Sequence, residues 1–206
     1  MYKECKKKKD KEGLALVAIT RQFAKNKNWE QSKTEESFID QHLLPFLTPI
    51  FLNDGAFSHS RSAERISLSD SSLSASKGKD SCMMLKPDFC IVYEFKGNGV
   101  RLLAITVKLP NAASSQLLSD RSKLGLEMKR MVDEQTIQGS FEPKSFGVLV
   151  EGFECTLFVC TLEQNGCYLF VKVEKLWMLR SWDDMMIIPD LVRAFMKIKA
   201  ICYDRN

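Results

Sequence analysis

The most constraining feature of this chain is a pair of β-strand patterns joined by a glycine-rich turn. Residues 86–93 and 102–108 are rich in β-branched and aromatic side chains, and Gly97-Asn98-Gly99 lies between them. Glycine and asparagine tolerate the positive φ angles that tight turns require. The pattern therefore predicts a β-hairpin.

Counting across this hairpin predicts which side chains meet. If the turn centres on Asn98, the residue numbers of cross-strand partners sum to about 196. Asp88 then lies opposite Lys108, and Cys90 opposite Thr106, all on one face of the sheet. One interpretation of the Asp88–Lys108 pair is an ordinary cross-strand ion pair, contributing at most about 1 kcal/mol. The other is a functional site.

Pro87-Asp88 with Lys108 resembles the motif of the PD-(D/E)XK nuclease-like domains. The resemblance implies that Asp88 binds a divalent cation, that an acid two residues before the lysine shares it, and that Lys108 positions or activates water. Here that acid's position holds Thr106, a degenerate metal position, because Mg²⁺ prefers carboxylate and phosphate oxygens. Mg²⁺ is therefore expected only if the chain is active.

A literal Glu-x-Lys sequence occurs at Glu94-Phe95-Lys96. Six strand residues at about 3.3 Å each put Glu94 roughly 20 Å from Asp88, too far to share one ion. We therefore interpret Glu94 and Lys96 as solvated charges beside the turn.

Two helical patterns offer further site residues. The first follows a helix start at residues 32–37, and the resemblance implies that a carboxylate on it, Glu36 or Asp40, joins the metal site. Both acids also suit the start of a solvated helix. The second helix follows Lys108, and the resemblance implies that Lys123 and Glu127 lie at the active site or on the phosphate path. Four residues apart, they also fit a surface ion pair.

The order of patterns predicts an α/β fold, more specifically an α+β mixed sheet. Residues 146–150 form a nearly wholly apolar strand, a second hairpin turns at Gln164-Asn165-Gly166, and a helix begins near Asp183 or Asp184. The resemblance implies a restriction-endonuclease-like core, with helices flanking a central mixed sheet and with a C-terminal hairpin and helix added. With 206 residues and 45% hydrophobic content, one domain over residues 30–206 is expected.

Charge sets the N-terminus apart. Residues 1–29 hold nine Lys or Arg and three acids, a net charge of +6, whereas the remainder has a net charge of −2. We expect a basic, partly disordered arm, and a mobile serine-rich loop over residues 58–81. The arm is either a solvated tail or a nuclear-localisation or phosphate-binding patch. Its nucleic-acid-binding candidates are Lys6, Lys7, Lys8 and Lys9.

Residues 118–129 and 148–153 further resemble a multicopy group of uncharacterised fungal proteins, over roughly residues 30–202. That resemblance implies the fold rather than an activity, and a link to mobile elements rests on analogy alone. The seven cysteines never form C-x-x-C, which favours reduced thiols in the nucleus or cytoplasm. No apolar run reaches the roughly 18 residues of a membrane span.

Three functions follow, and no phosphate loop, G-x-S-x-G elbow or H-E-x-x-H motif competes with them. The first is a degenerate nuclease-like domain that contacts nucleic acid with little or no cleavage. The second is an active Mg²⁺-dependent nuclease whose missing acid has relocated to Glu36, Asp40 or Glu127. The third is a protein interaction module with a vestigial site. None of the three requires a small-molecule cofactor or a membrane.

Overall fold

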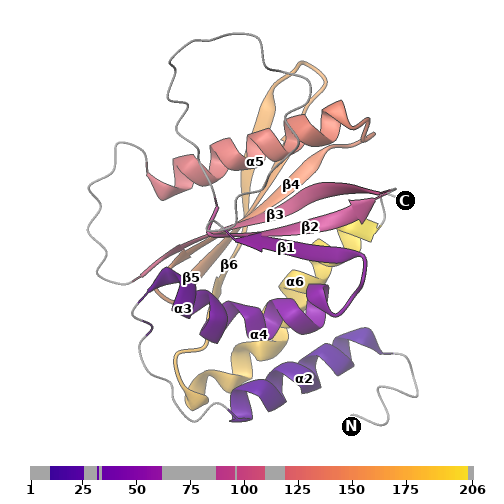
Figure 1. Cartoon of the computed structure of the whole chain (residues 1–206). Coiled ribbons are helices and arrows are strands. Elements are labelled where there is room, and N and C mark those ends of the chain that lie inside the picture. Colours follow the sequence, from indigo (N-terminus) through magenta and orange to yellow (C-terminus); the bar gives the residue numbers. More distant parts are fainter. Residues whose placement is uncertain are drawn as a thin grey trace.

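The chain folds around one mixed β-sheet with helices on both faces (Figure 1). The computed structural model describes residues 10–25, 32, 34–61, 87–95, 97–109 and 119–203. The N-terminal half supplies four short helical segments after one longer helix: α2 (Lys11–Lys25), α3 (Glu35–Phe38), the π-helix η1 (Ile39–Leu43), α4 (Leu44–Leu47) and the π-helix η2 (Thr48–Leu52).

Six strands and two long helices make up the rest of the described chain. The strands are β1 (Phe57–Arg61), β2 (Phe89–Phe95), β3 (Asn98–Lys108), β4 (Lys144–Glu151), β5 (Glu154–Leu162) and β6 (Tyr168–Trp177). The helices are α5 (Asp120–Ile137), the 3₁₀ segment η3 (Trp182–Ile187) and α6 (Ile188–Tyr203).

The strands lie side by side in their order along the chain, from β1 to β6. Every neighbouring pair is antiparallel except β3 and β4, which are parallel and are joined through α5. A parallel pair needs such a crossover, usually a helix, because the chain must return to its starting edge. The predicted mixed sheet with flanking helices is confirmed, as are the second hairpin, β5–β6, and the last helix.

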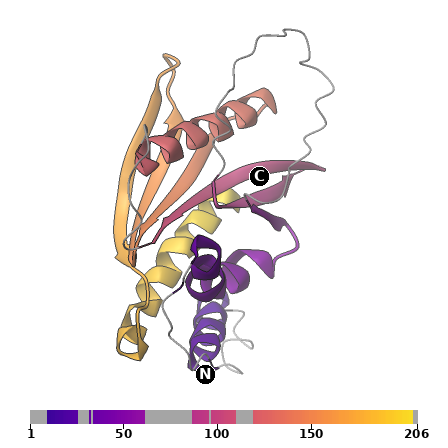
Figure 2. The same cartoon turned by 60° about the vertical axis from the view of Figure 1, so that its left-hand side comes forward.

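Helices divide unequally between the two faces. Helix α5 alone crosses one face, and α2, α3, α4 and α6 lie on the other (Figures 1 and 2). The larger core lies on the four-helix side and includes Phe23, Phe46 and Phe195. The smaller core lies beneath α5 and includes Leu124 and Met128. Among the described residues, the α5 face is therefore covered by fewer helices than the other face.

Helix α5 approaches β4 closely because Gly147 has no side chain. A Cβ at that position would clash with the sulfur of Met128 and would lie 3.1 Å from Leu124. The Ser145 hydroxyl, two residues away on the same face, donates a 2.8 Å hydrogen bond to the Met128 carbonyl. These contacts fix the helix across the strand and so fix where its N-terminus points.

The first hairpin forms, but its predicted register is wrong. Phe95 pairs with Asn98, so the turn centres before Gly97, whose φ is +81°. A bulge at Ile91/Val92 then shifts the register, and Cys90 pairs with Ala104 rather than with Thr106. Bulges place two residues opposite one, which a count from the turn cannot anticipate.

The predicted N-terminal arm also differs from the structure. Residues 11–25 of the expected 1–29 arm form α2, and Ala15, Ile19 and Phe23 are buried in the core. Their spacing of four residues makes one apolar helical face, which the lysines around it obscured. The expected loop over residues 58–81 likewise overlaps β1, which runs to Arg61.

Candidate functional site

The motif residues gather at the end of β3, on the face that α5 covers. Ala104 belongs to the core beneath α5, and side chains alternate along a strand, so Thr106 and Lys108 share its face. Extending the hairpin register by one residue sets Asp88 level with Thr106. Asp88 therefore lies beside the position of the missing acid rather than opposite Lys108, as the sequence had predicted.

Asp88 is held by the neighbouring strand. Its Oδ2 accepts a 2.7 Å hydrogen bond from the Val107 N–H. Burial raises the pKa of Asp88, the Val107 bond opposes that increase, and the charge of Asp120 adds to it. A carboxylate whose charged form is disfavoured by its surroundings is a common feature of functional sites.

Lys108 pairs with Asp120, the first residue of α5. Its Nζ lies 2.8 Å from Asp120 Oδ2, and Lys123 Nζ lies 3.5 Å from Asp120 Oδ1. Burial acts to raise the pKa of Asp120, but the hydrogen bond and charge of Lys108 outweigh it and lower that pKa. Asp120 therefore forms ion pairs with both Lys108 and Lys123. The predicted Asp88–Lys108 pair is replaced by one between Lys108 and α5.

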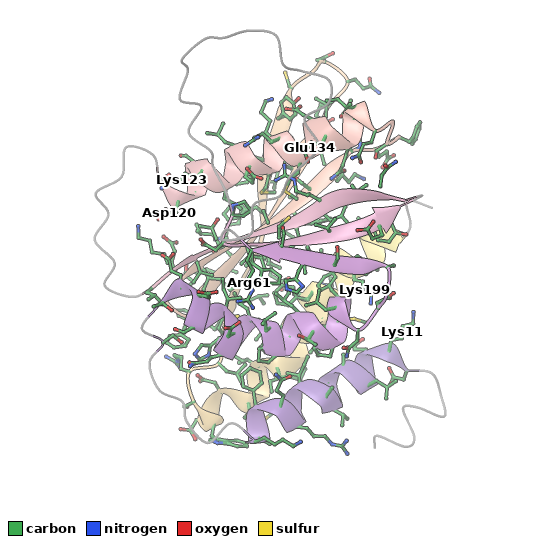
Figure 3. All side chains as sticks on the ribbon, viewed as in Figure 1. Lys11, Arg61, Asp120, Lys123, Glu134 and Lys199 are labelled. Carbon is green, nitrogen blue, oxygen red and sulfur yellow. The ribbon has the colours of Figure 1, made fainter. Side chains whose placement is uncertain are left out.

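A third carboxylate, Glu35, reaches this group from the start of α3. Glu35 is an exposed residue, but partial burial of its carboxylate raises its pKa, and so do the charges of Asp88 and Asp120, whereas Lys108 and Lys123 lower it. We call Glu35, Asp88, Lys108, Asp120 and Lys123 the acid–lysine cluster. Figure 3 shows Asp120 and Lys123 together at the N-terminal end of α5.

The sequence pointed to Glu36 and Asp40 for this role, and in the structure both pair with Arg61. Their carboxylates lie 3.5 and 2.7 Å from the guanidinium of Arg61 on β1. Consecutive helical residues point about 100° apart, so Glu35 and Glu36 cannot face the same site. No local pattern separates Glu35 from Glu36, because Phe38 and Ile39, each three residues after one of them, are both buried.

Glu127 is also wrongly placed by the sequence prediction. Its side chain is 3% exposed and pairs with Arg101 of β3. Arg101 also bonds both carboxylate oxygens of Glu134, at 2.9 and 2.5 Å. We call these three residues the Arg101 cluster. Arg101 precedes Thr106, the residue level with Asp88, by five strand residues, roughly 17 Å. Glu127 is therefore too far from Asp88 to share an ion with it.

The acid–lysine cluster is not a preformed metal cage. In the described parts of the chain, no three His, Cys, Asp or Glu side chains are arranged to hold a metal ion. Thr106, half-buried on β3, contributes only a hydroxyl. Two carboxylates are nevertheless enough chemically, because Mg²⁺ keeps several waters and completes its shell with substrate phosphates.

The remaining predictions are only partly addressed. Lys123 does lie beside the site, although it contacts Asp120 rather than Glu127. Lys6 to Lys9 fall outside the described residues. No helix within the described ranges is long and apolar enough to cross a membrane. The chain matches no protein-family model, no curated protein and no solved structure.

Proposed function

We propose that this chain is a PD-(D/E)XK nuclease-like domain that contacts nucleic-acid phosphates at the acid–lysine cluster, with little or no cleavage. The observation that supports the proposal is that both lysines of the cluster pair with Asp120 and, in the described part of the chain, neither forms an ion pair with Asp88 or Glu35. Asp120 takes both lysines, while the pKa values of Asp88 and Glu35 are raised by burial and by neighbouring carboxylates. Two carboxylates that repel each other at a sheet end favour binding of a cation.

The cluster's residues divide the work of binding a phosphate. Asp88 and Glu35 would hold a divalent cation such as Mg²⁺, which supplies charge neutralisation for a phosphate oxygen. Lys108 and Lys123 add positive charge at the same edge, and the N-terminus of α5 adds the positive end of its dipole. Its first-turn N–H groups follow the N-cap Ser119.

Two features of the cluster argue for weak catalysis. Thr106 offers a neutral hydroxyl where the resemblance implies an acid, so the protein supplies fewer charged ligands for the cation. Lys108 donates to Asp120 at 2.8 Å, which engages the ammonium that would otherwise position a water beside the phosphate. A group must reach the reacting atoms to act on them.

The test is binding of a fluorescein-labelled 20-nucleotide hairpin DNA by the full chain, in Mg²⁺, in Ca²⁺ and in EDTA. Divalent cations should tighten binding, and Asp88→Asn or Glu35→Gln should abolish that enhancement. Glu36→Gln is the matched control, because it removes the adjacent charge, which faces Arg61. Equal binding by all four proteins in every buffer would overturn the proposal.

A second candidate is an active Mg²⁺-dependent nuclease in which Glu35 supplies the missing acid. The specific observation in its favour is that the charge of Asp88 raises the pKa of Glu35, so the two carboxylates interact. Plasmid DNA incubated with Mg²⁺ or Mn²⁺ separates the two candidates. Nicking that is lost in both Asp88→Asn and Glu35→Gln but retained in Glu36→Gln would favour the enzyme over the binding domain.

A further inference from the structure

A groove runs along the other side of α5, between that helix and β6. Its volume is about 450 Å³, within the range of small-ligand sites. We call it the α5–β6 groove, and its lining residues are Arg121, Ser122, Gly125, Leu126, Lys129, Cys160, Tyr168 and Phe170. Its first lining residues, Arg121 and Ser122, lie in the same first turn of α5 as Asp120, so the groove adjoins the acid–lysine cluster.

The rings of Tyr168 and Phe170 line the groove. Lys129 Nζ lies 4.4 Å from the Tyr168 centroid, and the buried Phe158 packs against Phe170. Phe158 and Phe170 stack with ring centroids 4.8 Å apart and planes tilted by only 11°. The Arg121 guanidinium lies over both rings, 5.4 Å from the Phe158 centroid and 5.9 Å from that of Phe170. Gly125 lines the groove beside Phe170, and a Cβ there would lie 3.8 Å from that ring, in ordinary van der Waals contact.

The groove carries excess positive charge. Arg121 is exposed, and no carboxylate among the described residues pairs with it. Lys172 is exposed and pairs across the sheet with Phe158, which places it on the same face. The acid beside the groove, Asp133, is already engaged, because it bonds Lys129 at 2.8 Å and accepts from the Tyr168 hydroxyl.

We infer that the α5–β6 groove binds single-stranded nucleic acid, with Arg121 and Lys172 on phosphates and a base against the Arg121–Phe170–Tyr168 surface. Cationic side chains interleaved with aromatic rings are the chemistry by which proteins hold unpaired nucleotides. Unpaired bases also stack on arginine guanidinium planes. The bases of a duplex are stacked on one another and cannot present a face to a recessed ring.

This inference rests on the proposed function, because it takes nucleic acid as the ligand, but it makes a separate prediction. The acid–lysine cluster needs a divalent cation to hold a phosphate, whereas the groove does not. Binding of a single strand at the groove should therefore persist in EDTA. A strand that crosses the first turn of α5 would contact both sites.

The experiment measures anisotropy of fluorescein-labelled dT12 with the full chain in EDTA at fixed salt. Arg121→Ala and Phe170→Leu should each weaken binding about tenfold, the scale of losing one stacked base. Arg130→Ala is the charge-matched control, because Arg130 is exposed on the same helix outside the groove, where it lies 3.8 Å from Glu127, and it should change binding less than twofold. Thermal melts check that each variant folds.

Three results would contradict binding at the α5–β6 groove, and one, a crosslink, would support it. Unchanged dT12 binding by both Arg121→Ala and Phe170→Leu would overturn the inference, while the proposed function would stand if the Mg²⁺-dependent binding still required Asp88. Equal competition by duplex DNA or by oligoglutamate would replace a single-strand site with a nonspecific charged surface. A 5-bromouridine strand that crosslinks to the peptide containing Tyr168 and Phe170 would support the inference directly. No binding of any nucleic acid would remove both proposals.

Discussion

The two ends of β3 carry similar charges to opposite effect. At the Arg101 end, one guanidinium meets the carboxylates of Glu127 and Glu134. Burial opposes the charge of Arg101, but the two glutamates outweigh it and hold the pKa of Arg101 above its usual range. At the Lys108 end, two lysines meet one acid and leave Asp88 and Glu35 with raised pKa values.

This difference in charge pairing distinguishes a structural end of β3, at Arg101, from the end where we propose the functional site, at Lys108. At the Arg101 end each carboxylate faces the guanidinium, although Glu127 Oε2 has no hydrogen-bond partner among the described residues and lies 3.8 Å from Arg130. We therefore interpret this set as structural. A set that retains repulsion lowers stability unless something else binds to it. Both sets sit beneath or beside α5, and Figure 3 shows Glu134 near one end of that helix and Asp120 at the other.

The largest expected effect lies at the Arg101 end. Arg101→Met should lower the free energy of unfolding by about 3–5 kcal/mol, because Glu127, 3% exposed, is left as a buried charge without its guanidinium. Urea denaturation measures it. The double variant Arg101→Met/Glu127→Leu should recover most of the loss, since an apolar pair needs no compensation. No recovery would mean that the charges stabilise the fold by themselves.

The opposite sign is expected at the Lys108 end. Asp88→Asn should keep a hydrogen-bond acceptor for the Val107 N–H and remove a charge that its surroundings disfavour. We expect a stabilisation of about 1 kcal/mol at pH 7, or a melting temperature about 3 °C higher. Differential scanning calorimetry checks it. A destabilised variant would make Asp88 structural and erase the contrast between the two ends.

The pH dependence of stability provides a further test of the raised pKa of Asp88. The pKa of Asp88 is raised in the folded chain above its unfolded value of about 3.9, so between the two values the folded state binds more protons. Stability must then fall as pH rises through that window. The melting-temperature advantage of Asp88→Asn should be largest at pH 7 and vanish below about pH 4. An advantage that is constant with pH would have another cause.

The smallest effect separates two neighbours on α3. Glu36→Gln removes a surface contact 3.5 Å from Arg61 and should cost at most about 1 kcal/mol, while leaving the divalent-cation dependence of DNA binding intact. Glu35→Gln should do the reverse, losing the cation dependence without loss of stability. Isothermal calorimetry with Mg²⁺ or Mn²⁺ distinguishes them. Identical behaviour of both variants would contradict the placement of Glu35 at the site.

Much of the architecture follows from local patterns. The alternation of β2 and β3, the apolar run of β4 and the Asn165-Gly166 turn each predict their element correctly. Lys108 and Asp88 were identified by spacing, and both lie in the acid–lysine cluster. The register error arose at the turn, because Phe95 rather than a residue nearer Asn98 begins the pairing; the bulge at Ile91/Val92 changes the register by only one residue.

The sequence by itself determined the element types and their order, because helical and strand periodicity are local properties of the chain. The tertiary structure decided which charges meet. Glu35 rather than Glu36 reaches Asp88, and Glu127 pairs with Arg101. Those choices depend on helix rotation and on where α5 crosses the sheet. Both are fixed by long-range contacts, such as the one between Gly147 and Met128, that no local pattern encodes.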